Sequence, residues 1–380
     1  MAVRTLCFDL RKIGDTGIGR MITTSLTPIL ARGDDDWRYV LIVREGVELE
    51  QYLGSARERV TVIREDARNY SWRELAYIPI LVARLRPDLL YVPHYTVPLV
   101  TRRLRLVVTI HDVIHLRLND RRLDLVRRAY AHSMIRRAAR ADCILVPSVA
   151  TKRDLLEIFN VDERRLRIVP NCADPLFQPQ TAEAAWQTCA RYGITGPFIL
   201  YVGMWKPHKN LPTLIEAFGQ LRNQLGWRGQ LVLIGTPDPR ARSRIQDLIQ
   251  RAAIARDVVI LDFVSDTHLR DIYSAATALV QPSLYEGWGL PVSEAMACGT
   301  PVICSTAGSL PEVAGSAALM FEPTDHVRLV THLQTVTSSP GERTRLSNLG
   351  LERARLFSPE RTADLMLAAF QDVLNDGWRG

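Results

Sequence analysis

Short apolar runs alternate with helix-like stretches along the whole chain, and the alternation occurs twice. RTLCFDL at 4–10 opens the first series, and FILYVG at 198–203 opens the second. Such runs predict strands buried on both faces, while the stretches between them have the period of amphipathic helices. This alternation predicts parallel sheets with helices on both faces. We therefore expect an α/β protein with two doubly wound domains.

The expected elements follow from the positions of these runs. Strands are expected at 4–10, 39–43, 89–92, 104–110, 143–148, 198–203, 230–235, 258–263, 278–283 and 300–305. Helices are expected near 18–32, 71–85, 121–139, 149–159, 211–225, 240–255, 266–276, 291–298, 325–337 and 358–375.

The boundary between the two series lies in a loop-like gap. Residues 169–184 read VPNCADPLFQPQTAEA and contain three prolines, which is typical of a connection. We expect domains at 1–175 and 176–357, with the helix in 358–380 packing back on the first domain. Two doubly wound domains that face each other would bind a ligand between them, at the carboxyl ends of their strands.

Composition limits the class of protein. The chain is 47% hydrophobic and 23% charged, as soluble globular proteins are. It has no apolar run long enough to span a membrane, and its first residues read as a strand rather than a signal peptide. The six cysteines form no CxxC pair or Cys/His cluster. They predict reduced, buried thiols in a cytoplasmic protein without a bound metal.

The basic charge is concentrated in the first half. Residues 1–175 carry 30 Lys and Arg against 22 Asp and Glu, a net of +8, whereas residues 176–380 carry 18 against 19, a net of −1. A basic half suits nucleic acid, an anionic membrane or an anionic substrate. Solvated arginines on an ordinary helix face explain the charge equally well.

A glycine-rich segment, IGDTGIGRM at 13–21, follows the first strand. It fails the dinucleotide fingerprint because residue 22 is isoleucine, and it fails the phosphate-loop pattern because Arg20-Met21 replaces Lys-Ser/Thr. Glycines still allow a backbone to approach a ligand closely. We expect ligand contact here, with a plain tight turn as the alternative.

Two glutamates flank the start of a predicted helix near the end of the second series. Glu286 lies in the loop after ALVQPS, and Glu294 lies in the helix that Pro291 opens and Gly299 ends. Carboxylates accept hydrogen bonds from sugar hydroxyls, and helix N–H groups favour a phosphate. The spacing predicts a nucleotide sugar site. The alternative is that Glu294 complements the helix dipole and Glu286 is solvated.

A second phosphate contact is expected in YVGMWKPHKNLP, residues 201–212. Lys209 precedes Asn210, which is expected to cap a helix whose second residue is Pro212. Lys209 would reach a bound diphosphate, with Lys206 and His208 nearby. A solvated lysine before a helix is the alternative.

These segments resemble family 4 of the retaining glycosyltransferases, which have the GT-B fold of two Rossmann-like domains. The resemblance is collinear from about residue 9 to the end and is most specific in the second half. It is carried by the motifs GIG at 17–19, His111-Asp112, VPN at 169–171, VG…KN at 202–210, EGWGLPVSEAMACGTPVI at 286–303 and SLPEVAG at 309–315.

The resemblance implies roles for particular residues. Glu294 would hold the ribose hydroxyls, Glu286 would face the transferred sugar and Lys209 would neutralise the diphosphate. His111 would lie beside the donor sugar, so His111, Glu286 and Lys209 form the expected catalytic set. The other expected donor-binding residues are Gly17, Ile18, Gly19, Gly203, Lys206, Phe263, Val264, Gly287, Gly289 and Leu290. No cofactor or metal is required, because cationic side chains and helix dipoles stabilise the leaving group.

Two positions depart from the family pattern. Met204 stands where many relatives have arginine after VG, and His208 stands where some have arginine before the lysine. Lys206 or Arg20 would then assist Lys209. A non-catalytic paralogue that only binds nucleotide sugars is the alternative.

The acceptor side is expected in the first half. His111 follows a strand, where histidines commonly act on ligands, and His94 is expected to contact the acceptor. Helices at 71–85 and 121–140 combine arginines with apolar faces, which favours a lipid-linked glycan acceptor at the inner face of the plasma membrane. Core-facing helices are the alternative.

The segment FDLRKIGDTGIGRM at 8–21 resembles bacterial polysaccharide mannosyltransferases. The expected donor is therefore GDP-mannose, with a UDP-hexose as the alternative. A nucleic-acid binder is disfavoured because the chain has no basic-aromatic motif. A nicotinamide oxidoreductase is disfavoured by the failed fingerprint.

Overall fold

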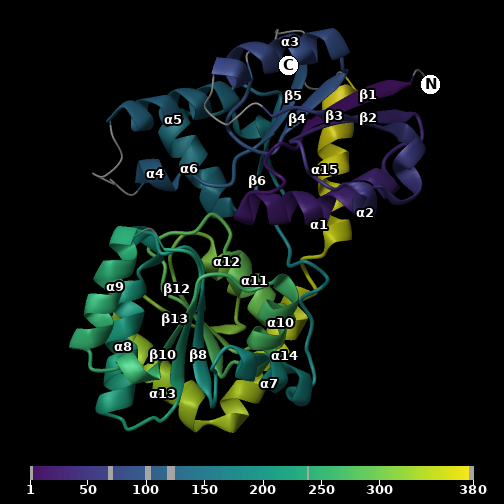
Figure 1. Ribbon diagram of the computed structural model, residues 1–380. Coiled ribbons are helices and arrows are strands. Elements are labelled where there is room, and N and C mark those ends of the chain that lie inside the picture. Colours follow the sequence, from purple (N-terminus) through teal and green to yellow (C-terminus); the bar gives the residue numbers. More distant parts are fainter. Residues whose placement is uncertain (1–2, 67–71, 99–103, 118–124, 238, 376–380) are drawn as a thin grey trace. The chain divides into compact units, whose positions relative to one another are not determined.

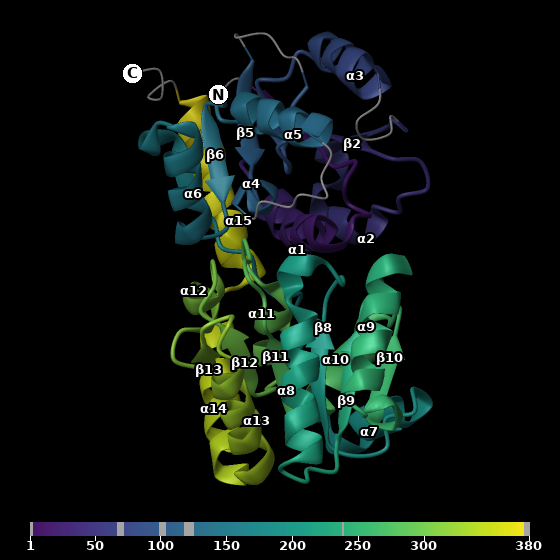
Figure 2. The ribbon, with the colours of Figure 1, turned by 90° about the vertical axis from the view of Figure 1, so that its left-hand side faces the viewer.

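The chain forms two α/β units in a computed structural model that describes residues 3–66, 72–98, 104–117, 125–237 and 239–375 (Figures 1 and 2). The N-terminal unit comprises Met1–Asn171 and Pro359–Gly380, and the C-terminal unit comprises Cys172–Ser358. The two divisions fall near the positions expected from the sequence, 175/176 and 357/358.

The N-terminal unit contains a seven-stranded sheet in the order β3-β2-β1-β4-β5-β6-β7. All of its paired strands are parallel. The strands are β1 (Arg4–Asp9), β2 (Trp37–Val43), β3 (Val60–Arg64), β4 (Leu89–Val92), β5 (Arg105–Thr109), β6 (Cys143–Val146) and β7 (Leu166–Ile168). The helices are α1 (Thr16–Arg32), α2 (Glu50–Leu53), α3 (Trp72–Leu85), α4 (Ile114–Arg117), α5 (Leu125–Ala138), α6 (Val149–Phe159) and α15 (Pro359–Leu374).

The C-terminal unit contains a six-stranded parallel sheet in the order β10-β9-β8-β11-β12-β13. Its strands are β8 (Phe198–Val202), β9 (Gln230–Ile234), β10 (Val258–Leu261), β11 (Ala278–Gln281), β12 (Val302–Ser305) and β13 (Ala318–Phe321). The helices are α7 (Ala182–Arg191), α8 (Leu211–Asn223), α9 (Pro239–Arg251), α10 (Asp266–Ala275), α11 (Leu290–Ala297), α12 (Leu310–Ala314), α13 (His326–Ser338) and α14 (Pro340–Ala354). In both sheets the order reverses beside the first strand, as in doubly wound folds. The expected α/β class is confirmed.

The last helix, α15, packs on the first unit although it lies almost 200 residues after that unit's last strand (Figure 1). The ring of Phe370 lies 5.6 Å from that of Phe8 in β1 and 5.2 Å from that of Tyr91 in β4. At the helix surface, Arg32 of α1 forms two hydrogen bonds, of 2.7 and 2.8 Å, with Asp364. The helix thus completes the core on this face of the sheet.

Three strands that the sequence analysis did not predict are all edge strands. β3 and β7 are the two edges of the first sheet, and β13 is one edge of the second. Their residues are mostly half-buried or exposed. In β3 and β7, polar residues interrupt the continuous apolar run that marks a strand covered on both faces. β13, with the sequence ALMF, is apolar throughout and was missed although it carries this signal. Helices α7 and α14 were also not predicted. The expected helix at 121–139 corresponds to α5, and its residues 121–124 lie outside the described part of the chain.

Candidate donor site in the C-terminal unit

The carboxyl ends of β8 and β11 carry the two loops that form the site. The backbone N–H of Leu284 donates to the carbonyl of His208 at 2.7 Å. The side-chain amide of Asn210 donates to the carbonyls of Pro282 and Pro323, both at 3.0 Å. Asn210 is the N-cap residue of α8, as expected, but its side chain makes no capping hydrogen bond to the helix backbone. Its backbone is left-handed, with φ of 53°. Its side-chain amide instead joins the neighbouring loops through the two hydrogen bonds to Pro282 and Pro323.

These contacts bring Lys209 and Glu286 together. The Lys209 ammonium lies 2.7 Å from Oε1 and 2.9 Å from Oε2 of Glu286. Glu286 is only 6% exposed. A carboxylate buried to this extent is stable only if it is paired and hydrogen-bonded. The pair therefore requires further donors.

Two side chains at the end of β11 supply these donors. Gln281 Nε2 and Ser283 Oγ donate to Glu286 Oε1 at 2.8 and 2.6 Å. Burial by itself would raise the pKa of Glu286, but the charge and hydrogen bonds of Lys209, the Ser283 hydroxyl and the nearby His208 outweigh it and hold that pKa below its usual value. Glu286 is thus an ionised, fixed hydrogen-bond acceptor. The sequence analysis missed Gln281 and Ser283, although a glutamine in a buried strand is itself a signal.

The segment from Ser305 to Ser309 packs against the loop that carries Glu286. Ser309 Oγ donates to the carbonyls of Glu286 and Trp288 at 3.2 and 2.7 Å. Gly308, with φ of +60°, lies so close that an added Cβ would be 2.4 Å from the Glu286 carbonyl oxygen. Ser309 thus links the SLPEVAG motif to the loop that carries Glu286.

Helix α11 begins next to this loop, as the sequence predicted. Gly289 has φ of +104° and Pro291 lies in the first turn. Glu294 is 1% exposed, and its Oε2 accepts a hydrogen bond of 3.0 Å from the Tyr273 hydroxyl. Tyr273 was not predicted from the sequence. It positions the second glutamate from the neighbouring helix α10.

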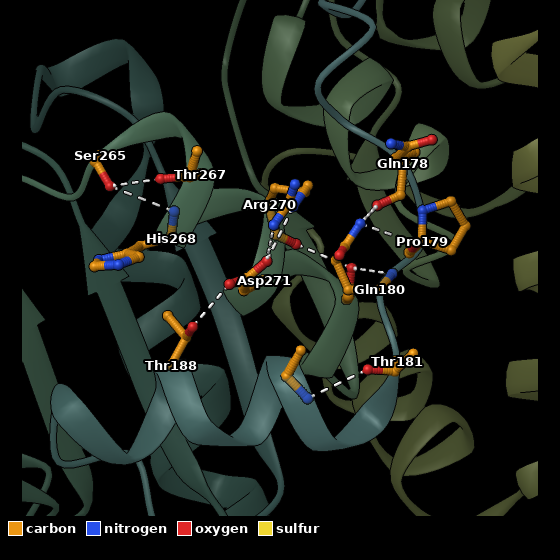
Figure 3. A network of polar contacts seen from close by, with 12 residues as sticks. Gln178, Pro179, Gln180, Thr181, Thr188, Ser265, Thr267, His268, Arg270 and Asp271 are labelled. Atoms are coloured by element: carbon orange, nitrogen blue, oxygen red, sulfur yellow. Dashed lines mark hydrogen bonds and ion pairs between the residues drawn. The ribbon is translucent and has the colours of Figure 1, made fainter.

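A polar network holds α10 against α7 and the preceding loop (Figure 3). Thr188 of α7 donates to Asp271 at 2.7 Å, and Arg270 donates to the same carboxylate at 2.8 and 2.9 Å. The backbone N–H of Gln180 donates to Ser274 Oγ at 3.2 Å. Because Tyr273 lies between these residues, the network fixes the helix that orients Glu294.

The remaining donor-site residues differ in exposure. Lys206 and Phe263 are exposed, the latter 82%, whereas Val264 packs in the core and offers no side chain to a ligand. Gly203 contacts Gly235 so closely that a Cβ on Gly235 would lie 2.1 Å from the Gly203 carbonyl oxygen. Gly287 is buried in the loop, and Leu290 is partly buried at the first position of α11.

The glycine-rich segment of the N-terminal unit is part of a helix. The helix was expected to begin near residue 18, and α1 begins at Thr16, so Gly17, Ile18 and Gly19 all lie in its first turn. An added Cβ on Gly19 would lie 2.3 Å from the Ile13 carbonyl oxygen, whereas one on Gly17 would meet open space. Packing of the turn therefore accounts for Gly19, and Gly17 leaves the backbone open to approach.

The two expected histidines follow neighbouring strands of the N-terminal sheet. His111, after β5, bonds the Pro93 carbonyl at 2.9 Å through Nε2. A carbonyl only accepts, so Nε2 carries the proton. Burial lowers the pKa of His111, although the Pro93 carbonyl and Asp112 act against it. His94, after β4, is 7% exposed. Among the described residues, no group of three or more His, Cys, Asp and Glu could hold a metal ion.

Comparisons with known families agree with this division of the chain. The family described as "Glycosyltransferase Family 4" matches residues 31–176, and "Glycosyl transferases group 1" matches residues 192–353. Each half of the chain thus matches a glycosyltransferase family, as the resemblance indicated. The described part contains no helix long and apolar enough to cross a membrane.

The curated relatives include several mannosyltransferases. O-antigen chain mannosyltransferase B of Escherichia coli is 29% identical over 61% of this chain and 61% of its own length. The serotype-specific mannosyltransferase WbdA of Escherichia coli is 28% identical over 78% of this chain but only 38% of its own length. MMP alpha-(1->4)-mannosyltransferase of Mycolicibacterium hassiacum is 32% identical over 67% of this chain and 60% of its own. The chain thus spans less than two thirds of these relatives.

Solved structures show the same GT-B fold. Sucrose-phosphate synthase of Thermosynechococcus elongatus matches with a TM-score of 0.77, at 22% identity over 97% of this chain and 98% of that one. WaaG, a glycosyltransferase involved in lipopolysaccharide biosynthesis, matches with a TM-score of 0.76, at 16% identity over 98% of this chain and 100% of that one. At these identities the likeness concerns the fold alone.

Proposed function

We propose that this protein is a retaining glycosyltransferase that moves a hexose from a nucleotide sugar to a glycan or lipid-linked oligosaccharide in polysaccharide or glycoconjugate synthesis. The observation that carries the proposal is the buried Lys209–Glu286 pair, 2.7 Å apart, with the buried Glu294 in the helix that follows. A cation and two fixed hydrogen-bond acceptors beside a helix N-terminus suit a diphosphate between two sets of hydroxyls.

The proposed chemistry assigns one role to each group. Departure of a nucleoside diphosphate develops negative charge, which the Lys209 ammonium and the first N–H groups of α11 would stabilise. Glu286 would accept hydrogen bonds from the transferred sugar, and Glu294 from the ribose. His111, with its proton on Nε2, is proposed to lie beside the donor sugar.

No metal ion has a role in this proposal. The cationic side chains and helix N–H groups of the donor site would supply the stabilisation that a divalent cation gives elsewhere. Turnover that persists in EDTA would support this part of the proposal, and turnover that requires added Mg²⁺ or Mn²⁺ would contradict it.

GDP-mannose is the proposed donor. Support comes from the mannosyltransferases among the curated relatives. A UDP-hexose is the alternative, since HepE from Anabaena, solved with UDP-glucose, has the same fold at 16% identity. Thermal-shift measurements with GDP, UDP and ADP distinguish the two. We expect GDP to give the largest stabilisation, because ligand binding to the folded state raises the melting temperature.

Activity and stereochemistry need a second measurement. Incubation with GDP-mannose should release GDP, and proton NMR of the product should show the anomeric configuration of the donor. Binding of GDP without any turnover would instead favour the non-catalytic paralogue, which is suggested by the exposed Met204 in place of arginine. An inverted product would contradict the retaining mechanism.

We also propose a cytoplasmic enzyme that attaches peripherally to the inner face of the plasma membrane. Tyr77 and Ile80 of α3 are 37% and 49% exposed, and the N-terminal half carries the excess of arginine. Such surfaces favour anionic lipid. Sedimentation with anionic liposomes at low and high salt tests this, and the absence of salt-sensitive binding would contradict it.

A further inference from the structure

A polar cavity lies at the carboxyl ends of β1 and β4 in the N-terminal unit. Its volume is about 10 Å³, which is room for one water-sized group. Val92 and Pro93 form part of the wall. The polar lining residues are Asp9, Arg11, Lys12, Glu74, His94 and Thr96, all between 3% and 9% exposed.

The charges around this cavity cancel. Arg11 donates to both oxygens of Asp9 at 2.8 and 2.7 Å and to Glu74 at 3.2 Å. Lys12 is the second cation of the lining, and its charge balances that of the second carboxylate, Glu74. Two further charged side chains act on Lys12. The Asp15 carboxylate lies 3.7 Å from the Lys12 ammonium, and the positive charge of Arg44 offsets it. Counted over the described residues, the cavity therefore has no net charge with which to neutralise a buried anion.

His94 offers one hydrogen-bond donor. Its Nδ1 accepts a hydrogen bond of 3.1 Å from the backbone N–H of Thr96 and lies 2.7 Å from the Thr96 hydroxyl. The proton of the neutral ring is therefore on Nε2. Burial, followed by the charges of Lys12, His111 and His115, holds the pKa of His94 well below its usual value. Within the described residues no hydrogen-bond partner occupies Nε2.

We propose that this cavity receives a hydroxyl group of an uncharged sugar at the end of the acceptor, in preference to a phosphorylated sugar. A hydroxyl both accepts and donates, so it suits the His94 Nε2–H together with the carboxylates of Asp9 and Glu74. A phosphate is larger than one water and would be buried without a compensating charge. The inference rests on the proposed function, because it takes the N-terminal unit to be the acceptor side.

The test compares two probes on the full-length protein saturated with GDP. Saturation-transfer NMR titrations measure the dissociation constants of methyl α-D-mannopyranoside and D-mannose 6-phosphate. We expect the neutral glycoside to bind at least about tenfold more tightly, a difference of about 1.4 kcal/mol. Equal or tighter binding of the phosphorylated sugar would overturn the proposal, and this comparison needs no variant.

Variants of His94 then locate the binding site. His94→Phe removes the donor and should weaken the neutral glycoside about tenfold, whereas His94→Gln, whose amide can occupy the place of Nε2, should stay within about threefold of the wild type. His132→Phe, at a ring that stacks on Phe159 with centroids 5.0 Å apart, is the matched control and should change nothing. Unchanged binding in His94→Phe would overturn the proposal.

GDP binding in the same samples separates two kinds of failure. If GDP does not bind and no other nucleoside diphosphate does, the proposed function fails. If GDP binds and the preference for the neutral glycoside is missing, only the inference about the acceptor fails.

Discussion

The Lys209 ammonium contacts both carboxylate oxygens of Glu286, at 2.7 and 2.9 Å. The two residues are 77 positions apart, and the loops after β8 and β11 bring them together. Oε1 of Glu286 receives three donors, from Lys209, Gln281 and Ser283. A donor sugar would therefore be expected to meet Oε2, which accepts a hydrogen bond from Lys209 at 2.9 Å.

Replacing Lys209 should abolish most turnover. Lys209→Ala removes the cation that would stabilise the leaving diphosphate, so we expect donor turnover to fall at least ~100-fold. The matched control is Lys152→Ala, which removes the lysine of a surface pair with Glu163 at 2.8 Å and should retain turnover. GDP release from GDP-mannose measures both. Normal turnover in Lys209→Ala would exclude the assigned role.

The same pair should make stability depend on pH. The pKa of Glu286 is depressed in the folded protein, so its contribution is present above the unfolded pKa and is lost as the pH falls through the folded one. In Lys209→Met the buried carboxylate has no cation, and the loss should be about 3–5 kcal/mol at about pH 7. The loss should shrink near about pH 4, because protonated Glu286 needs no partner.

Chemical denaturation at several pH values measures this dependence. The control is the double variant Lys209→Met/Glu286→Gln, which has no buried carboxylate. Its free energy of unfolding relative to wild type should not show the additional loss that Lys209→Met shows at neutral pH. A Lys209→Met penalty that is constant from acid to neutral pH would show that Glu286 does not depend on the lysine charge.

The Tyr273 hydroxyl should matter for donor binding rather than for folding. Tyr273→Phe removes the 3.0 Å hydrogen bond to Glu294 and keeps the ring, so we expect the KM for the donor to rise about 3- to 10-fold, as for the loss of one hydrogen bond. Tyr192→Phe, which removes a bond of 2.8 Å to His268, is the control. Equal donor KM values in the two variants would argue against a positioning role for Tyr273.

Gly308 should tolerate no side chain. In Gly308→Ala the new Cβ would lie 2.4 Å from the Glu286 carbonyl oxygen, at φ of +60°, so the loop must shift. Gly193→Ala has a similar φ of +73° but open space around it, and its cost should be about 1 kcal/mol from backbone strain alone. We expect Gly308→Ala to lose clearly more stability and to lower turnover. Urea unfolding of both variants measures the difference, and equal losses would show that the close contact is unimportant.

The sequence by itself determined the two doubly wound units and the positions of both glutamates, because buried parallel strands and a Pro-started helix leave strong local patterns. Edge strands β3 and β7 escaped prediction because polar residues interrupt their apolar runs, whereas β13 was missed although its four residues are apolar. The need for glycine at position 19 has a packing reason that the sequence did not reveal, because an added Cβ would lie 2.3 Å from the Ile13 carbonyl oxygen.

Only the tertiary structure decided which groups meet. The contact between Lys209 and Glu286, the hydroxyl of Tyr273 on Glu294 and the balanced charges around His94 all join residues from different loops or elements. No local pattern encodes such contacts, because they depend on how parallel strands align their carboxyl ends in a sheet. The sequence thus determined which chemical groups are present, and the packing of the strands and helices decided which of them can act together.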